Sequence, residues 1–522
     1  MVSWIRLIDD QVRVFVRFLT VEGVAESESI LLSTFPLKYE LRTAVAALGP
    51  DEAVVVWNEP GADGDNDGIF GQRVRRTGPV GPRFLVNTYT AGNQKLPVIS
   101  SNGRSRFVVA WESEGQDGSL TGIYAQRFDA LGTKLGPELQ VSSDANSDQV
   151  RPWVSMDALG NFVVAFYNTF ESEDLAEDSF LRAYGNDGTP LGPQVLVNEQ
   201  IIYEQELPTV ALSDAGLVQV AYQSWRQAPG DPESPYDYDI MTRRFVLPCV
   251  EDAHTLCLGG GRFRVRAFWT DYLGATGAGS SVPLSADSGG FSFFAPGRLE
   301  LLAKIVDGCG SNQHFWFYAA GLTDVDVDLL VTDTWTGKVA MYTNPLGVPY
   351  LPVQTIDRFD TCAASAPLAA ADSAASAVSA ASARAAASSE SASMEQGPLA
   401  MGAPGGSCLP DATTHCLAGG RFRVRARWRD FAAAAGEGHT LPFGDESGLF
   451  WFFSPENVEL VVKVVDGCDL DQRFWVYASG LTNVAVDLEV VDSISGLTWT
   501  RTTDLGEPFP PAFDVDAFAS CP

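Results

Sequence analysis

The sequence predicts an all-β protein in which propeller-like four-stranded repeats are followed by two homologous β-sandwich modules. Three observations support this fold class. A block of Val, Ala and aromatic residues recurs at regular steps in the N-terminal half, and a longer segment recurs once in the C-terminal half. Neither region shows the apolar periodicity of an amphipathic helix. Repeats of this kind are typical of units that bury their apolar faces against one another.

The N-terminal repeats, residues 1–247, contain the blocks AVVVWNE, FVVAWES, FVVAFYN and LVQVAYQS, which begin at residues 53, 107, 162 and 217. Each block precedes an acidic loop and a further apolar segment such as GIFGQRV or GIYAQRF. Short segments rich in Val, Ile and aromatics, separated by Gly, Asp, Asn and Pro, indicate strands and tight turns. Four such strands in about 50 residues predict a propeller blade.

The first repeat is visible only in part, because VSWIRLI at residues 2–8 already matches the apolar block of the later repeats. We therefore expect about four and a half blades, and a natural start upstream of Met1 that would also explain why no signal peptide is visible. Either strands from elsewhere complete a closed ring, or the propeller is open or small.

The C-terminal repeat comprises residues 248–362 and 408–522. A shift of 159 residues aligns residues 249–362 with residues 408–521 without a gap and brings their four cysteines into register. RFRVRAFW and VDVDLLV alternate polar and apolar residues, as half-buried strands do. About seven such strands predict an antiparallel β-sandwich for each module. The intervening residues 363–407 are mostly Ala and Ser, so we expect a flexible tether there.

The cysteines indicate disulfides and an oxidising, extracellular or cell-surface setting. Four cysteines per module allow three pairings. We favour a short bridge, because CVEDAHTLC has no strand pattern and can fold back on itself, and a long bridge that pins the last strand to the sandwich. The expected pairs are Cys249–Cys257, Cys309–Cys362, Cys408–Cys416 and Cys468–Cys521.

The net charge of −31 is strongly acidic. Such a chain lacks the clustered Lys and Arg that bind nucleic-acid phosphates, and it is repelled by anionic membrane surfaces. No apolar stretch predicts insertion into a membrane. We expect a protein that attracts cations and has neither nucleic acid nor a membrane as its partner.

The loop GADGDNDGIF, residues 61–70, is the candidate cation site. Alternating carboxylates followed by Gly can wrap around Ca²⁺, which takes six to eight oxygen ligands. The loop lacks the closing acid of an EF-hand and of an integrin-type blade loop, since Val74 and Gly71 stand at those positions. The alternative is a solvated acidic turn. The candidate calcium ligands are Asp63, Asp65, Asp67 and, from the preceding strand, Glu59.

Three further patterns have a structural and a functional interpretation. The acidic loops of the other repeats, including that of Glu112 and Glu114, predict a solvated rim rather than more cation sites. The equivalent aromatics predict core packing rather than a sugar channel: Trp4, Trp57, Trp111, Phe166 and Tyr222. The Arg stripe that begins at Arg262 predicts pairing with Asp326 and Asp328 rather than a grip on anionic glycans.

The segment FVVAWESEGQDGSLTGIYAQRFDALG, residues 107–132, resembles secreted bacterial propeller repeats that are akin to integrin-like calcium-loop repeats. CLAGGRFRVRARW and VELVVKVVDGC resemble the Cys-bearing β-sandwich modules found at the C-termini of secreted bacterial proteins. These resemblances imply export and an extracellular setting. They imply no activity.

The sequence gives little support for catalysis. None of the four His lies in the N-terminal domain or recurs between the modules, which argues against a repeated zinc or His-based site. The leading expectation is a non-catalytic extracellular binding or adhesion protein, stabilised by calcium, whose partner is a glycan or another protein. The alternatives are an extracellular carbohydrate-active enzyme, a glycosidase or lyase that uses the propeller face, and a structural surface or matrix protein.

Overall fold

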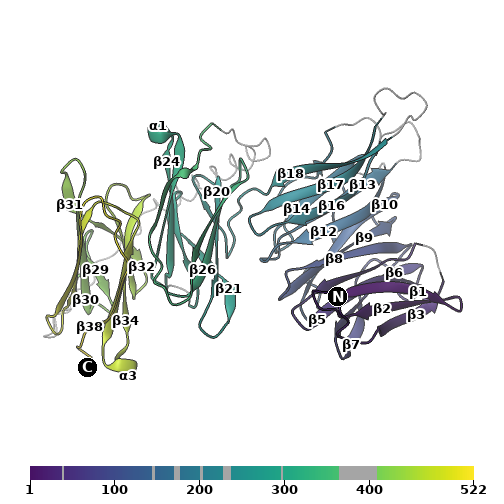
Figure 1. Cartoon of the computed structure of the whole chain (residues 1–522), viewed down its shortest axis with the longest axis horizontal. Coiled ribbons are helices and arrows are strands. Elements are labelled where there is room, and N and C mark those ends of the chain that lie inside the picture. The colour runs from purple at the N-terminus through teal and green to yellow at the C-terminus, as the bar shows by residue number, and fades with distance from the viewer. Residues whose placement is uncertain are drawn as a thin grey trace, which may run out of the picture. The chain divides into compact units, whose positions relative to one another are not determined.

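The computed structural model describes residues 1–37, 40–143, 147–169, 177–199, 204–226, 237–295, 298–363 and 408–521. The chain forms two compact units, Met1–Leu247 and Pro248–Pro522 (Figure 1). The described residues fold almost wholly as antiparallel strands, so the fold is all-β as predicted, and their two helices are the single turns α1 (Cys309–Asn312) and α3 (Cys468–Asp471). No helix in these ranges is long and apolar enough to cross a membrane. The expected tether, 363–407, lies outside the described residues from 364 onward.

The first unit contains five sheets, each of three or four strands. In chain order they are β1 (Val2–Ile8), β2 (Gln11–Arg17) and β3 (Ile30–Pro36); β4 (Thr43–Ala47), β5 (Glu52–Pro60), β6 (Asp67–Arg75) and β7 (Gly78–Leu85); β8 (Gln94–Ser101), β9 (Arg106–Glu114), β10 (Thr121–Asp129) and β11 (Leu139–Gln140); β12 (Asp148–Met156), β13 (Phe162–Thr169), β14 (Ser179–Tyr184) and β15 (Val195–Leu196); β16 (Gln205–Leu212), β17 (Leu217–Arg226) and β18 (Asp237–Val246).

The sheets stack face to face, and the first strands of successive sheets, β4, β8, β12 and β16, lie against one another. The first sheet lacks the strand equivalent to β4, and the fifth lacks the one equivalent to β7. The main contacts join neighbouring sheets within the described ranges, and none of them joins the first sheet to the fifth. Figure 1 accordingly shows these two sheets at opposite ends of the stack. The propeller-like repeats therefore form an open series rather than a closed ring.

Four of the five equivalent aromatic residues fill the layers between the sheets, as core packing requires, whereas Trp4 is half-buried and stacks on Phe15 of its own sheet. Trp57 packs against the first sheet, Trp111 against the second, and Phe166 against the third, and all three are fully buried. Tyr222 packs in the same way against the fourth sheet. Burying an aromatic ring removes a large apolar area from water. These rings therefore hold the stack together and do not line a channel for sugars.

Each module of the second unit is a sandwich of two five-stranded sheets. The first module has β19 (Leu256–Leu258), β20 (Phe263–Thr270), β21 (Thr276–Ala278), β26 (Asp326–Asp333) and β27 (Lys338–Asn344) in one sheet, and β22 (Ser280–Pro283), β23 (Ser288–Ser292), β24 (Leu301–Gly308), β25 (His314–Gly321) and β28 (Val353–Phe359) in the other. The second module repeats this with β29 (His415–Leu417), β30 (Phe422–Arg429), β31 (Ala435–Glu437), β36 (Ala485–Asp492) and β37 (Thr498–Thr503), and with β32 (His439–Phe443), β33 (Ser447–Trp451), β34 (Val458–Asp466), β35 (Phe474–Gly480) and β38 (Ala512–Phe518).

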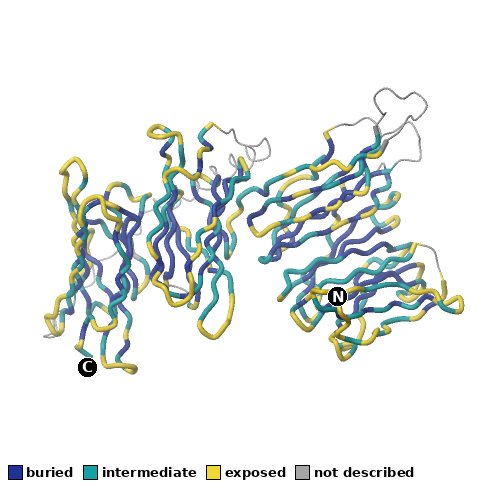
Figure 2. Tube along the Cα trace, viewed as in Figure 1, coloured by how far each residue is buried: buried dark blue, intermediate teal, exposed yellow. Residues whose placement is uncertain are grey.

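The core of each sandwich lies between its two sheets, where Figure 2 shows the buried segments in dark blue. Val265 and Leu329 from one sheet meet Ile305 and Phe317 from the other, and all four are buried. The alternation that predicted these strands thus places their apolar residues in the core.

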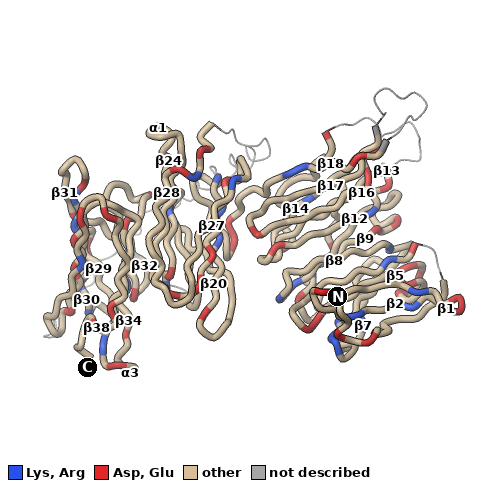
Figure 3. Tube along the Cα trace, viewed as in Figure 1, with Lys and Arg blue, Asp and Glu red and all other residues tan. Residues whose placement is uncertain are grey.

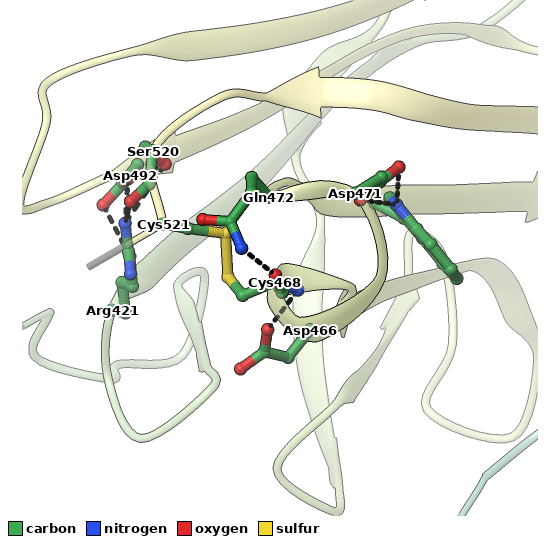
Figure 4. Close-up of a disulfide and its surroundings, with 9 residues drawn as sticks. Arg421, Asp466, Cys468, Asp471, Gln472, Asp492, Ser520 and Cys521 are labelled. Carbon is green, nitrogen blue, oxygen red and sulfur yellow. Dashed lines mark hydrogen bonds and ion pairs between the residues drawn. A yellow bond between two sulfur atoms is a disulfide. The ribbon is translucent and has the colours of Figure 1, made fainter.

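Each module carries two disulfides, one short and one long. The structure pairs the cysteines as the sequence predicts: Cys249–Cys257, Cys309–Cys362, Cys408–Cys416 and Cys468–Cys521. The long bridge connects the first residue of the single helical turn to the end of the module, as Figure 4 shows for Cys468 and Cys521. No bridge links the two modules.

Arg262, the first residue of the Arg stripe, pairs with a carboxylate of the neighbouring strand as predicted, but the partner is Asp333 and not Asp326 or Asp328. In the pairing of β26 with β20, Asp333 lies opposite Phe263, the residue that follows Arg262 in the chain. Asp326 and Asp328 do not lie at this end of the strand. The guanidinium of Arg262 donates two hydrogen bonds to Asp333, 3.0 and 2.7 Å long. It is also stacked against Phe315 and Trp335 and is 4% exposed. Arg262 is therefore half of an ion pair in the core and does not form a surface that binds glycans.

Candidate functional site

The acidic loop of residues 61–70 holds its carboxylates apart, each with a different partner. Asp63 accepts a hydrogen bond from the Asn87 amide at 3.0 Å. Asp65 accepts one from the backbone N–H of Gly92 at 2.9 Å. Asp67 is buried and accepts one from the Asn58 amide at 3.1 Å.

Glu59, the predicted fourth ligand, is held by an extended set of donors. Its carboxylate accepts hydrogen bonds from Trp57 at 2.9 Å, from Ser33 at 2.7 Å and from the guanidinium of Arg83 at 2.9 Å. An arginine at this distance satisfies the negative charge that a cation would otherwise neutralise. The structure therefore does not bring Glu59 together with the three aspartates, and calcium binding by the loop stays a prediction.

Within the described ranges, one group of three acidic, Cys or His side chains is close enough to share an ion: Asp466, Cys468 and Cys521. Both sulfurs of this group form a disulfide. A sulfur bonded to another sulfur is no thiolate, which is the form that binds metals. The group is therefore not a metal site.

A second polar cluster lies where the first strands of three sheets begin. Residues Leu96, Arg151 and Leu207 occupy equivalent positions in β8, β12 and β16, and each has a positive φ of 52–54°. The strand register shifts at each of them, so each is part of a β-bulge. Bulges re-aim backbone groups and side chains and are common beside active sites. Left-handed backbone at non-glycine residues is strained and persists only where the surroundings enforce it.

The bulge in β12 provides a backbone donor for a buried carboxyl group. The N–H of Arg151 donates a hydrogen bond of 2.8 Å to Oε1 of Glu112, which enters from β9 of the neighbouring sheet. Glu112 is 2% exposed. Burial raises the pKa of its carboxyl group, although the Arg151 N–H and the ammonium of Lys95 act in the opposite direction. A raised pKa favours the protonated acid.

Lys95 connects this buried acid to a second carboxylate. Its ammonium pairs with Glu40, just before β4, and lies 4.0 Å from Oε2 of Glu112. The hydrogen bond from Lys95 lowers the pKa of Glu40. One ammonium thus stands between two carboxyl groups whose pKa values are shifted in opposite directions. We call Glu40, Lys95, Glu112 and Arg151 the inner-edge cluster.

More acids and an aromatic side chain border the inner-edge cluster. Burial raises the pKa values of Glu206 and Glu177, and the charge of Glu204 adds to both shifts. Trp153 of β12 is 40% exposed, with the guanidinium of Arg42 5.5 Å above its ring. In Figure 3, acidic and basic segments stand together near the labels of β9, β12 and β16. An exposed aromatic face beside several carboxyl groups can stack against a sugar ring while acids act on it.

The prediction of a solvated rim is wrong for Glu112, which is buried, and it names none of the other residues of the cluster. Glu112 follows the aromatic of its block, as the rim acids do, and was expected in solvent. The signal that could have found the site is the proline that follows the bulge residue in LPVIS, RPWVS and LPTVA. A proline has no N–H for the sheet and marks a bulge or an edge.

The comparisons with known proteins found similar solved structures but no similar sequences. No protein-family model matches the chain, and no curated protein matches it. The GH93 alpha-L-arabinofuranosidase of Fusarium graminearum, solved with arabinobiose, has 11% identity and a TM-score of 0.30, with 60% of this chain and 84% of that chain covered. The alpha-L-arabinanase of Penicillium chrysogenum has 11% identity and a TM-score of 0.28, with 58% and 80% covered. The endo-arabinase of Bacteroides thetaiotaomicron has 11% identity and a TM-score of 0.25, with 56% and 90% covered.

These neighbours are glycan-cleaving enzymes, and this finding contradicts the expectation of a non-catalytic binding or adhesion protein. At TM-scores below 0.5 the likeness carries no argument about mechanism or substrate. An assignment of activity has to rest on the chain's own residues.

Proposed function

We propose that this protein is an extracellular carbohydrate-active enzyme that hydrolyses glycosidic bonds at the inner-edge cluster. The observation that carries the proposal is the pair Glu40 and Glu112, which share Lys95 and whose pKa values are shifted apart. Glycosidases need one protonated carboxylic acid and one carboxylate across the scissile bond. Two acids whose environments separate their pKa values are the usual basis for such an assignment.

We assign the two roles from the opposite directions of the pKa shifts of Glu112 and Glu40. Glu112 donates its proton to the glycosidic oxygen, which leaves as an alcohol. Glu40 is ionised and, acting as the base, takes a proton from the water that adds to the anomeric carbon. Lys95 keeps Glu40 ionised, and the Arg151 N–H orients the Glu112 carboxyl group. The products are two sugars with free hydroxyl groups, and the two glutamates exchange protonation states before the next turnover.

The surroundings favour a neutral glycan as substrate. The chain carries a net charge of −31, and the acids Glu177, Glu204 and Glu206 border the cluster. Uronic or sulfated sugars would be repelled by this field. Trp153 provides an apolar platform of the kind on which uncharged sugar rings stack.

The test is the release of reducing ends from a panel of neutral polysaccharides by the full chain. Glu112→Gln keeps the shape of the side chain and removes its proton, so turnover should fall by about 100-fold or more, the usual contribution of a general acid. Glu114→Gln is the matched control, because Glu114 lies two residues further along β9 and is exposed. Equal activity of Glu112→Gln and wild type, or no release from any substrate, would contradict the proposal.

A further inference from the structure

The face on which the two sandwich modules meet contains two buried ion pairs that repeat each other, beside a more exposed pair of Arg298 with Glu446 that has no equivalent. The ammonium of Lys304 in β24 lies 3.0 Å from Glu459 of the second module, and that of Lys463 in β34 lies 3.4 Å from Glu300 of the first. The 159-residue shift turns 300 into 459 and 304 into 463. Each pair is therefore the other with the modules exchanged. Contacts of the form i to j and j to i define an isologous, two-fold interface.

The apolar part of this face obeys the same rule. One buried cluster contains both members of three equivalent pairs, which are Leu299 and Val458, Leu302 and Val461, and Leu322 and Leu481. In Figure 1 the sheet that contains β34 faces the sheet that contains β24. Each module thus contributes equivalent strands with apolar side chains at equivalent positions, where the second module has Val in place of two of the Leu residues, so the face is complementary to itself in shape and charge.

The charged residues are removed from water, which makes the pairing selective. Lys304 is 4% exposed, Glu300 4%, Glu459 6% and Lys463 8%. A charge buried at an interface is strongly unfavourable when its partner is missing or has the same sign. The face therefore rejects surfaces that do not present a Lys and a Glu in this arrangement.

We propose that this face, formed by Leu299, Glu300, Leu302, Lys304 and Leu322 and by their equivalents in the second module, is a homotypic docking surface whose partner is a second copy of the same module. Within one chain the two modules satisfy each other, because a covalent connection gives them a high effective concentration. When the intramolecular pairing is blocked, the same face pairs between chains.

Exchanging the charges of one module tests this directly. In Glu300→Lys/Lys304→Glu, the first module presents Glu against Glu459 and Lys against Lys463, so pairing within the chain is repelled. Two copies of the altered first module still match each other, and so do two copies of the unaltered second module. An isologous face thus predicts that a clash within one chain becomes an attraction between chains.

The measurement is the molar mass of the full chain by light scattering during size-exclusion chromatography at micromolar concentration. Wild type should have the single-chain mass, 56.1 kDa, and Glu300→Lys/Lys304→Glu should assemble to twice that mass or more. Adding Glu459→Lys/Lys463→Glu restores complementarity within the chain and should return the single-chain mass.

The reciprocal variant Glu459→Lys/Lys463→Glu alone should assemble like Glu300→Lys/Lys304→Glu. Because it alters the other module, it shows that assembly does not come from misfolding of one particular module. Circular dichroism establishes that each variant is folded. A folded charge-exchanged chain that keeps the single-chain mass in both versions would overturn the proposal. The proposal would also be overturned if the variant that carries all four substitutions assembled to the same extent.

Discussion

Arg262 and Asp333 form an ion pair inside the first module, with 2.7 Å between their nearest nitrogen and oxygen atoms. Arg421 and Asp492 repeat it in the second module at 2.9 Å (Figure 4). Each pair joins the start of a strand to the end of its neighbour. The arginine also donates to the backbone at the end of the module, to Thr361 in one copy and to Ser520 in the other. The pair therefore fastens the last residues to the sandwich beside the long disulfide.

Breaking this pair should destabilise the module strongly. Asp333→Asn leaves the guanidinium of Arg262 buried without a counter-charge, which costs about 3–5 kcal/mol. The free energy of unfolding from urea titration measures the loss. The matched control is Glu489→Gln, which removes the exposed partner of Arg423 and should change stability by less than about 1 kcal/mol. Similar losses for the two variants would show that the Arg262 pair is not the stronger contact.

The same pairs predict that the second unit loses stability in acid. Burial alone would raise the pKa of Asp492, but hydrogen bonds from Arg421, Ser520 and the backbone lower it below its ordinary value. The unfolded chain, with a pKa of about 3.9, then binds more protons than the folded chain at and below that pH. The stabilisation is complete above about pH 4 and is lost as the pH falls through the folded pKa.

Unfolding free energies of wild type and Asp492→Asn between about pH 3 and 6 check this prediction. The difference between the two should be largest at the upper end and should shrink as the pH falls, because the unfolded wild-type chain takes up a proton at Asp492 before the folded chain does. A difference that stays constant over this range would mean that the Asp492 pKa is not lowered by folding.

Calcium binding by the acidic loop stays a testable prediction. A ligand that binds the native state alone stabilises it, so millimolar Ca²⁺ should raise the melting temperature of the full chain. Asp65→Ala should abolish most of that gain. Asp129→Ala is the control, since Asp129 lies at a turn in the neighbouring repeat unit, where its carboxylate accepts hydrogen bonds from Leu131 and Thr133. An equal response in wild type and Asp65→Ala would refute the loop as the site.

The sequence alone is enough to predict the strands, the modules and the disulfide pairs, because each depends on local periodicity or on the 159-residue register. The inner-edge cluster could not be found in this way. Glu112 and Arg151 belong to two different sheets and Glu40 lies before the first strand of a third, and bulges that shift the strand register bring them together. The partner of Arg262 was missed for a related reason. The pairing of β20 with β26 fixes which aspartate lies beside Arg262, and alternation does not reveal that register.

The assignment of Glu112 as the acid and Glu40 as the carboxylate is tested most directly by varying the leaving group. Aryl glycosides with a nitrophenyl-type leaving group need little protonation, whereas unactivated oligosaccharides need a general acid. Glu112→Gln should therefore lose activity on oligosaccharides by about 100-fold or more and retain most of it on activated aryl glycosides. Glu40→Gln should lose activity on both, because the water-activating carboxylate is required whatever the leaving group. Equal losses on both substrates in Glu112→Gln, or an active Glu40→Gln, would contradict the account.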